Sequence, residues 1–164
     1  MRRILFFLLA SGPLAVPSMA IAGSTQFAGA WCVGTNDEDD ISRQWGAANA
    51  SDIDLYCSGW GVTPTSSTVD ASNVDAAFLS YYDGDGAPYI TATFCLDNAD
   101  DLSEWDCGSV YDTCSEYGCA AQWFGSGTLE LDPPEGSFSS AHNMNIYVTL
   151  PSESRVISYS FDSY

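Results

Sequence analysis

Residues Asn145 to Phe161 read NIYVTLPSESRVISYSF, and they show most clearly what kind of fold the chain adopts. Apolar side chains occupy every second position in both halves of this segment: Ile146, Val148 and Leu150, then Ile157, Tyr159 and Phe161. A period of two residues is typical of β-strands that bury one face. The four residues Pro151–Ser154 predict a turn, because proline and serine favour turn conformations. We therefore expect two strands, Asn145–Leu150 and Val156–Phe161.

Two further alternating runs lie near the middle of the chain. In Asn73–Tyr82 one face holds Val74, Ala76, Phe78, Ser80 and Tyr82. In Tyr89–Leu96 one face holds Ile90, Ala92, Phe94 and Leu96. The residues between the runs read Asp83-Gly84-Asp85-Gly86, and glycine supplies the positive φ angle that tight hairpin turns require. The sequence therefore predicts a β-hairpin.

Four shorter segments complete the expected strands: Ala30–Gly34, Ile53–Gly59, Cys119–Phe124 and Thr128–Asp132. About eight short strands with polar turns are typical of an antiparallel β-sandwich. We predict this all-β fold, with a closed β-barrel as the alternative that the same pattern allows. The interruption Asp97–Tyr117 is too long for an ordinary loop. We expect it to be an excursion held by disulfides, with one helical turn near residues 100–105.

The first residues have the features of an export signal. Met1-Arg2-Arg3 is positively charged, an apolar run extends from Ile4 to Val16, and Ala20-Ile21-Ala22 places small residues where signal peptidase cleaves. The apolar run is shorter than the roughly 20 residues that span a bilayer. We predict a secretory signal peptide over residues 1–22 and a single mature domain over residues 23–164. The mature protein is expected to be secreted, either extracellular or periplasmic.

All six cysteines lie in the predicted mature domain: Cys32, Cys57, Cys95, Cys107, Cys114 and Cys119. An even number of cysteines in an exported chain indicates disulfides, so we expect three. We predict the pairs Cys32–Cys57, Cys95–Cys119 and Cys107–Cys114, each of which closes a local segment. A zinc site is disfavoured, because none of the cysteine spacings is C-x2-C and the only histidine, His142, is remote.

The composition restricts the class of partner. The chain has 22 acidic and 4 basic residues and a formal net charge of −18. Removal of the leader leaves two basic residues, Arg43 and Arg155, and a net charge of −20. Such a surface repels phosphate groups, so we expect no nucleic acid and no membrane as a partner. High negative charge is typical of proteins adapted to high salt and of proteins that attract a cationic surface. We expect a monomer.

No arrangement of residues identifies a catalytic site. A serine or cysteine nucleophile needs a nearby base, and the single histidine, His142, lies in a polar segment. Paired carboxylates hydrolyse glycosidic bonds in many enzymes, but 22 acids define no specific pair. Alternation also places Glu130 on an outer face. We predict no catalytic residues, with a small carboxylate-dependent hydrolase as an alternative.

Exposed aromatic rings are the best candidates for ligand binding. Alternation turns Tyr81 and Tyr89 away from the predicted core face, and flat rings on a β-sandwich stack well on sugars. These tyrosines would flank the acidic turn that contains Asp83 and Asp85. The two aspartates are also weak calcium candidates, because calcium takes oxygen ligands. We expect no other cofactor.

A series of different short motifs is spread over nearly the whole predicted mature chain. They comprise an early cysteine, a Gly-x-x-Asn-x-Ser segment, two later cysteines and a closing Leu-Pro and Ile-x-Tyr pair, at Cys32, Gly46, Asn49, Ser51, Cys57, Cys95, Leu150-Pro151 and Val156–Tyr159. This arrangement resembles a loose group of small secreted β-domain proteins of myxobacteria and related marine bacteria. The chain departs from the group at Val148 and Thr149, where a cysteine is usual, and in its additional Cys107, Cys114 and Cys119. The resemblance implies secretion and a β-sandwich, and it implies no mechanism.

These features together predict a secreted, acidic, disulfide-stabilised β-sandwich. We expect it to act as a non-enzymatic extracellular binding or structural module, whose ligand is a glycan or a cationic surface. A carbohydrate-binding module that uses exposed aromatic residues is the first alternative, and the hydrolase is the second.

Overall fold

The computed structural model describes residues 23–35, 41–44, 47–49, 53–59, 69, 71–84, 89–98, 101–114, 125–138 and 142–163. These residues form eleven β-strands and one short 3₁₀ helix, η1 (Gly29–Trp31). All the strand pairings are antiparallel. The predicted all-β class is therefore confirmed. None of the described helices is long and apolar enough to cross a membrane.

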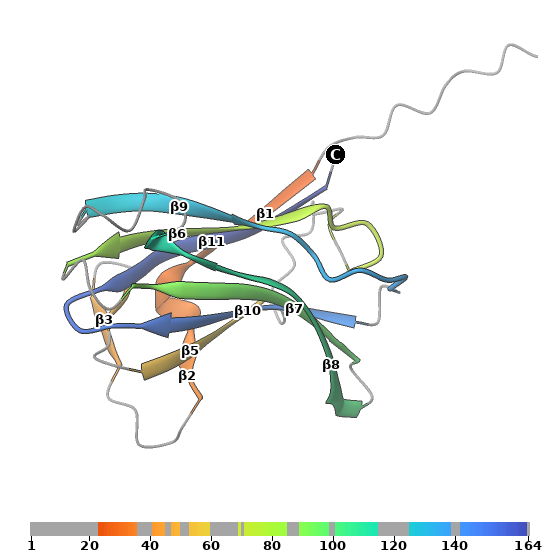
Figure 1. The fold of residues 1–164 in the computed structure, drawn as a ribbon, viewed down its shortest axis with the longest axis horizontal. Helices are drawn as coiled ribbons and strands as arrows, with labels where there is room; N and C mark the ends of the chain where they lie inside the picture. Colours follow the sequence, from red (N-terminus) through yellow and green to blue (C-terminus); the bar gives the residue numbers. More distant parts are fainter. Residues whose placement is uncertain are drawn as a thin grey trace, which may run out of the picture.

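One sheet has six strands, and its longer strands form the upper layer of Figure 1. They are β1 (Gly23–Ala28), β3 (Ser42–Gln44), β4 (Ala47–Asn49), β6 (Ala76–Asp83), β9 (Gly125–Leu131) and β11 (Arg155–Ser163). The order is β3-β4-β11-β6-β9, and β1 pairs with β11 as well. The beginning of β11 pairs with β4, and the rest of the same edge pairs with β1.

The second sheet has five strands. They are β2 (Val33–Gly34), β5 (Ile53–Ser58), β7 (Thr91–Asn98), β8 (Asp101–Asp112) and β10 (His142–Leu150), in the order β2-β5-β10-β7-β8. The sheets face each other, because the Phe94 ring of β7 lies 5.4 Å from the Phe161 ring of β11. Two separate sheets that share one core form a sandwich and not a closed barrel.

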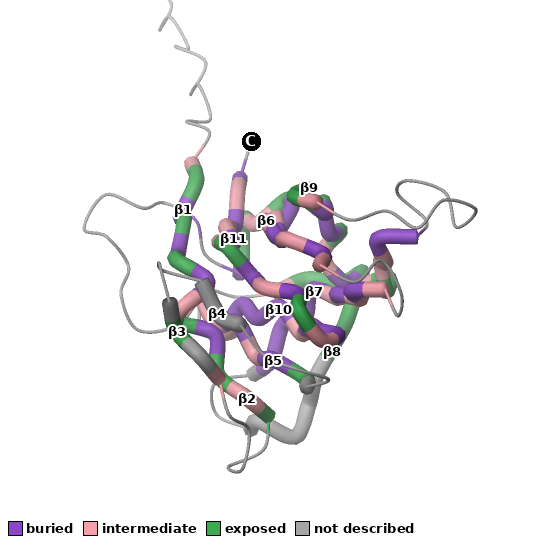
Figure 2. Tube along the Cα trace, turned by 90° about the vertical axis from the view of Figure 1, so that its left-hand side faces the viewer, coloured by how far each residue is buried: buried purple, intermediate pink, exposed green. Residues whose placement is uncertain are grey.

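The core consists of the inward faces of the central strands (Figure 2). On β10 the buried side chains are those that alternation predicts, Ile146, Val148 and Leu150, and on β7 the inward Phe94 and Leu96 are buried as well. On β11 the prediction holds for Tyr159 and Phe161. Ile157, however, is 40% exposed and Val156 is buried. A register shift between Val156 and Ser158 explains the difference, because a bulge reverses the side-chain alternation.

The predicted core face of β6 is wrong. Ala77, Leu79 and Tyr81 are fully buried, whereas Phe78 and Tyr82 lie on the outer face and are only partly buried. Both faces of this strand carry apolar or aromatic residues. Alternation alone therefore does not indicate which face points inward, and the pairing of β6 with β11 and β9 decides it.

The predicted hairpin between β6 and β7 is also wrong. The two strands lie in different sheets, so the connection after Asp83 crosses from one layer of the sandwich to the other. The turn at Pro151–Ser154 is confirmed, with a hydrogen bond of 3.3 Å from Ser154 N to Pro151 O. This turn likewise connects different sheets, since β10 and β11 belong to opposite layers.

The interruption expected over Asp97–Tyr117 contains a strand. β8 has 12 residues and pairs with β7 along most of its length. The helical turn expected near residues 100–105 is therefore wrong, because residues 101–105 belong to this strand. Strands β1, β3 and β4 were also not expected. The predicted strand Cys119–Phe124 lies outside the described residues.

The disulfide pattern is partly as predicted. Cys32–Cys57 is confirmed, with an S–S distance of 2.00 Å. The pairs Cys95–Cys119 and Cys107–Cys114 are wrong, because Cys95 is bonded to Cys107. The two cysteines stand directly opposite each other on β7 and β8. A hairpin therefore brings them together, which spacing along the chain did not reveal. Cys114 is disulfide-bonded as well, and Cys119 lies outside the described residues.

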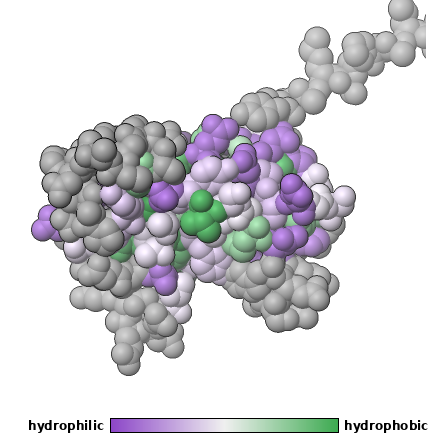
Figure 3. Space-filling model, in the orientation of Figure 1, coloured by the Kyte–Doolittle hydropathy of each residue, from purple (hydrophilic) through white to green (hydrophobic). Residues whose placement is uncertain are grey.

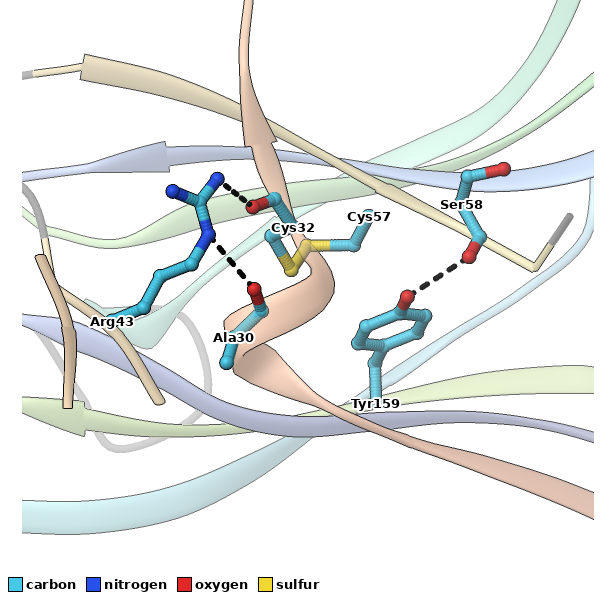
Figure 4. The surroundings of a disulfide bond; sticks show 6 residues. All are labelled: Ala30, Cys32, Arg43, Cys57, Ser58 and Tyr159. Carbon is cyan, nitrogen blue, oxygen red and sulfur yellow. Dashed lines mark hydrogen bonds between the residues drawn. A yellow bond between two sulfur atoms is a disulfide. The ribbon is translucent and has the colours of Figure 1, made fainter. Parts of the chain in front are cut away.

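Polar contacts hold the two sheets together beside the first disulfide (Figure 4). The guanidinium of Arg43 donates from Nε to Ala30 O at 2.9 Å and from a terminal nitrogen to Cys32 O at 3.1 Å. The hydroxyl of Tyr159, on β11, donates to Ser58 O, on β5, at 2.9 Å. A covalent bond and directed hydrogen bonds thus fix the edge where the chain passes from β1 to β2.

Candidate ligand-binding site

The structure does not form the rim that the sequence predicts around Tyr81, Tyr89, Asp83 and Asp85. Tyr81 and Asp83 are both 0% exposed, Tyr89 is partly buried, and Asp85 lies outside the described residues. The error follows from the wrong core face of β6, because Tyr81 and Asp83 lie on the inward side of that strand.

The Asp83 side chain takes part in hydrogen bonds that connect separate parts of the fold. Its carboxylate accepts hydrogen bonds from the hydroxyls of Thr113, at 3.3 Å, and Ser154, at 3.4 Å. These contacts connect the ends of β6 and β8 with the turn before β11. Within the described residues, no group of three or more His, Cys, Asp or Glu side chains could hold a metal ion. Asp85, the other calcium candidate, lies outside the described residues, so calcium binding at this turn stays a prediction.

The outer face of the five-stranded sheet has a different set of candidates. One row of directly opposed residues crosses all five strands: Val33, Tyr56, Tyr147, Thr93 and Val110. Directly opposed residues project from the same face of a sheet. Since the neighbours of Tyr147 on β10, Ile146 and Val148, point into the core, this row points outward.

A more polar row lies beside it. Asp54, Thr149, Thr91 and Asp112 are directly opposed on β5, β10, β7 and β8. The Thr149 hydroxyl donates to Asp54 Oδ1 at 2.7 Å. The Thr93 hydroxyl in the first row donates to Gly108 O at 3.1 Å. These hydrogen bonds hold side chains of the outer face in fixed positions.

Residues of both rows on β5, β10, β7 and β8 line an open groove with a volume of about 420 Å³. Its lining residues are Thr35, Asp54, Thr91, Ala92, Thr93, Val110, Tyr147, Val148 and Thr149. Ligand sites commonly have volumes of about 300–1,000 Å³. The groove is therefore large enough for a small ligand or for part of a longer one. It combines four threonines and one carboxylate with an aromatic ring.

Two tyrosines form the aromatic part of this face. The rings of Tyr56 and Tyr147 lie 5.1 Å apart in an edge-to-face arrangement, and both residues are partly exposed. Burial raises the pKa of Tyr56 to about 12, with a further contribution from the nearby Asp97 carboxylate. Burial also raises the pKa of Tyr147, and Tyr56 and Asp97 add to the shift. Both hydroxyls therefore keep their protons at neutral pH.

Beyond the tyrosines, the outer face carries two buried polar residues. Asn145 precedes Tyr147 by two positions on β10 and stands opposite Cys95, and the next outward residue of β10, Asn143, stands opposite Asp97. Asp97 and Asn145 are both 0% exposed. The Cys95–Cys107 disulfide lies beside Asn145 on the same face.

The electrostatic character of the groove is neutral to negative. Its only charged residue among the described lining is Asp54. Arg43 donates to backbone carbonyls near the first disulfide, and Arg155 lies 4.8 Å above the Tyr82 ring on the other sheet. The described part of the groove thus offers no cation to an anionic ligand.

The remaining surface has scattered apolar residues. The exposed large hydrophobic side chains among the described residues are Trp31, Val33, Val110 and Ile157. The surface in Figure 3 is mostly hydrophilic or neutral where it is described, with one strongly hydrophobic spot near its centre. Val33 and Val110 belong to the outward row of the five-stranded sheet, at its two edges. This row therefore combines two exposed valines with the Tyr56 and Tyr147 rings.

Two other residues considered in the sequence lie away from the groove. Glu130 is exposed on β9, as alternation predicts. His142 begins β10, is partly buried, and packs edge-to-face against Phe138 at 5.3 Å. The structure thus separates both residues from the candidate site.

No family model matches the chain, and no curated protein matches it. Among solved structures, the chain is similar to the Podospora anserina GH26-CBM35 β-(1,4)-mannanase, with a TM-score of 0.38 and 6% sequence identity. The alignment covers 87% of this chain and 28% of the mannanase chain. Likeness at this level carries no argument about the ligand.

Proposed function

We propose that the protein is a secreted, non-enzymatic binding module that holds a glycan in the groove on the outer face of the five-stranded sheet. The observation that carries this proposal is the groove of about 420 Å³, in which Tyr147 lies beside threonine hydroxyls and Asp54. The glycan is neutral or cationic, because the described lining contains no cation to receive an acidic sugar.

The side chains of the groove suit the chemistry of sugars. An aromatic ring provides a flat apolar surface for the carbon–hydrogen face of a sugar ring. Hydroxyl and carboxylate groups provide donors and acceptors for sugar hydroxyls. The open form of the groove suits a chain that enters and leaves along the sheet. This arrangement replaces the pair Tyr81 and Tyr89 as the aromatic part of a carbohydrate-binding module.

Binding explains the lining better than hydrolysis does. Glycoside hydrolysis commonly uses two carboxyl groups on either side of the scissile bond. The described lining of the groove supplies one, Asp54, and its Oδ1 accepts a hydrogen bond from Thr149. We therefore assign Asp54 to ligand positioning.

Export is part of the proposal. Disulfides persist in oxidising compartments, and the two described bonds fit such a location. We propose that residues 1–22 are a signal peptide, that Cys114 and Cys119 form a third disulfide, and that the chain belongs with the small secreted β-domain proteins that it resembles. Mass spectrometry of the exported protein tests the first two points, and free thiol at Cys119 would contradict the third bond.

Calorimetric titration with a panel of β-linked oligosaccharides tests the binding function. Tyr147→Ala removes the ring from the groove, and we expect at least about a tenfold loss of affinity, as for an aromatic anchor. Thr91→Val keeps the shape and removes one hydroxyl, so a smaller loss is expected. Tyr82→Ala, on the outer face of the other sheet, is the matched control and should bind normally. Failure of the whole panel to bind, or full affinity in Tyr147→Ala, would overturn the proposal.

A further inference from the structure

Two polar side chains on the outer face of the five-stranded sheet are buried without hydrogen-bond partners. Asp97 and Asn145 are each 0% exposed. Within the described structure, neither Oδ1 nor Nδ2 of Asn145 has a partner, and neither carboxylate oxygen of Asp97 has one with good hydrogen-bond geometry. The one interaction of Asp97 with a neighbouring side chain is with the Tyr56 hydroxyl, whose pKa it raises. Burying such groups unpaired is costly, most of all for a charged group. This cost makes the two side chains candidates for contact with a bound ligand.

These side chains continue the groove along β10. The outward residues of this strand follow in the order Thr149, Tyr147 and Asn145, and the first two line the groove. The negative charge of Asp97 contributes, after burial, to the raised pKa of both Tyr56 and Tyr147. The strand register also places Asp97 opposite Asn143, which lies two positions from Asn145 and four from Tyr147 on the same face of β10.

The chemistry of the four side chains selects a donor-rich cation. An ionised carboxylate only accepts hydrogen bonds, and a carboxamide adds one acceptor and two donors. A protonated amine supplies three donors and a positive charge that Asp97 attracts. Aromatic rings such as those of Tyr56 and Tyr147 also attract cations through their faces. The described cations, Arg43 and Arg155, are engaged elsewhere.

We propose that Asp97, Asn145, Tyr56 and Tyr147 form an ammonium-binding subsite at the end of the groove, which selects glycans that contain protonated amino sugars. This inference rests on the proposed glycan-binding function and names its ligand class. The amine donates to Asp97 and to Asn145 Oδ1. Because both residues are buried, entry of the amine requires the side chains that cover them to move.

Three β-1,4-linked tetrasaccharides test the subsite, because they differ only at the second carbon of each sugar. They are the tetramers of glucosamine, N-acetylglucosamine and glucose. Calorimetry is done at about pH 6, where an amine is protonated, and at ~0.15 M salt. We expect the glucosamine tetramer to bind at least about tenfold more tightly than either neutral tetramer.

Substitution Asp97→Asn removes the charge with little change in shape, and it should abolish the preference for glucosamine while binding of the neutral tetramers is kept. Tyr56→Leu, at a partly exposed position, is a second variant that should weaken the same preference. Glu130→Gln removes one charge from the exposed face of the other sheet. The Glu130→Gln variant should keep the preference for the glucosamine tetramer. This result would exclude a general attraction between a polycation and an acidic protein as the cause of the preference.

The outcomes separate the two proposals. If none of the three tetramers binds, the glycan-binding function is overturned, and the subsite with it. If the three bind equally, only the amino-sugar inference is overturned. A preference that survives Asp97→Asn, or that disappears equally in Glu130→Gln, also overturns the subsite and leaves the glycan-binding function standing.

Discussion

Gly29 lies in η1, against the backbone of β11. A Cβ atom on this residue would lie 2.1 Å from Val156 O and 2.7 Å from Val156 C. Backbone atoms in a paired strand cannot move aside as a flexible side chain can. We therefore expect Gly29→Ala to displace η1 and to lower the free energy of unfolding by about 1–3 kcal/mol, as overpacking does. Urea denaturation followed by circular dichroism measures this loss.

Gly34→Ala, in the neighbouring strand β2, is the control for that substitution. Gly34 is partly exposed, and replacing glycine by alanine reduces the conformational entropy of the unfolded chain at both positions. The loss should therefore be much smaller at residue 34. Equal losses would show that contact with Val156 is not the cause.

Tyr56 links the candidate site to stability at alkaline pH. Unfolded tyrosine loses its proton near a pKa of about 10, whereas burial and the Asp97 carboxylate raise the pKa of folded Tyr56 to about 12. Between these values the unfolded chain has released a proton that the folded chain still holds, so stability falls as pH rises.

Tyr56→Phe removes this proton and should flatten the decline between about pH 10 and about pH 12. A residual slope is expected, because burial raises the pKa of Tyr147 and Tyr159 too. Free energies of unfolding from urea titrations at several pH values give both slopes. An unchanged slope in the variant would show that Tyr56 titrates normally in the folded protein.

At the scale of elements, the alternation of apolar residues predicted most of the longer strands, but it did not predict which strands pair with each other. β10 and β7 have one clearly apolar face, and their inward residues were correctly predicted. β6 is apolar on both faces, so its orientation depends on pairing with β11 and β9. The β6–β7 hairpin failed for a similar reason, because turn residues between strands do not specify whether the second strand returns to the same sheet.

The candidate site was missed because it requires tertiary pairing. Tyr56 and Tyr147 are 91 positions apart in the chain and become neighbours only through the pairing of β5 with β10. Their positions on outward faces could be predicted from alternation in each strand. The order of the strands, which brings them together with Asp97, could not.

The two described disulfides stabilise different kinds of element. Cys95–Cys107 spans 12 positions and joins one hairpin, whereas Cys32–Cys57 spans 25 positions and is fully buried at the edge where the chain passes between the sheets. Loop entropy alone gives about 3 kcal/mol for the first and about 3.5 kcal/mol for the second.

Replacing both cysteines of each pair by alanine should therefore cost more at Cys32–Cys57, because a cavity in the core adds to the entropy. Free energies of unfolding from urea titrations compare the two double variants. The Cys95–Cys107 variant should remain a folded β-sandwich with β8 less protected from hydrogen exchange. A larger loss of stability at this second pair would contradict the assignment of β8 to a peripheral hairpin.

For the whole molecule, charge is the property that distinguishes this sandwich. The predicted mature chain has a net charge of −20 with two arginines, and the described contacts of both arginines are with backbone carbonyls and an aromatic ring. Repulsion among the carboxylates is therefore largely uncompensated within the chain. The two described disulfides and the shared core offset this repulsion at low salt.

Salt screens such repulsion, since the Debye length falls from about 30 Å at 0.01 M to about 3 Å at 1 M. We therefore expect the melting temperature to rise steadily with sodium chloride at pH 7, while affinity for an amino-sugar ligand falls. Calorimetric melting near about pH 4 is the control, because partial protonation of the carboxylates removes much of the repulsion. The salt effect should be much smaller there. A melting temperature that is independent of salt at pH 7 would contradict this prediction. It would show that repulsion among the carboxylates does not limit the stability of the folded protein, as expected if counterions are already bound at specific sites.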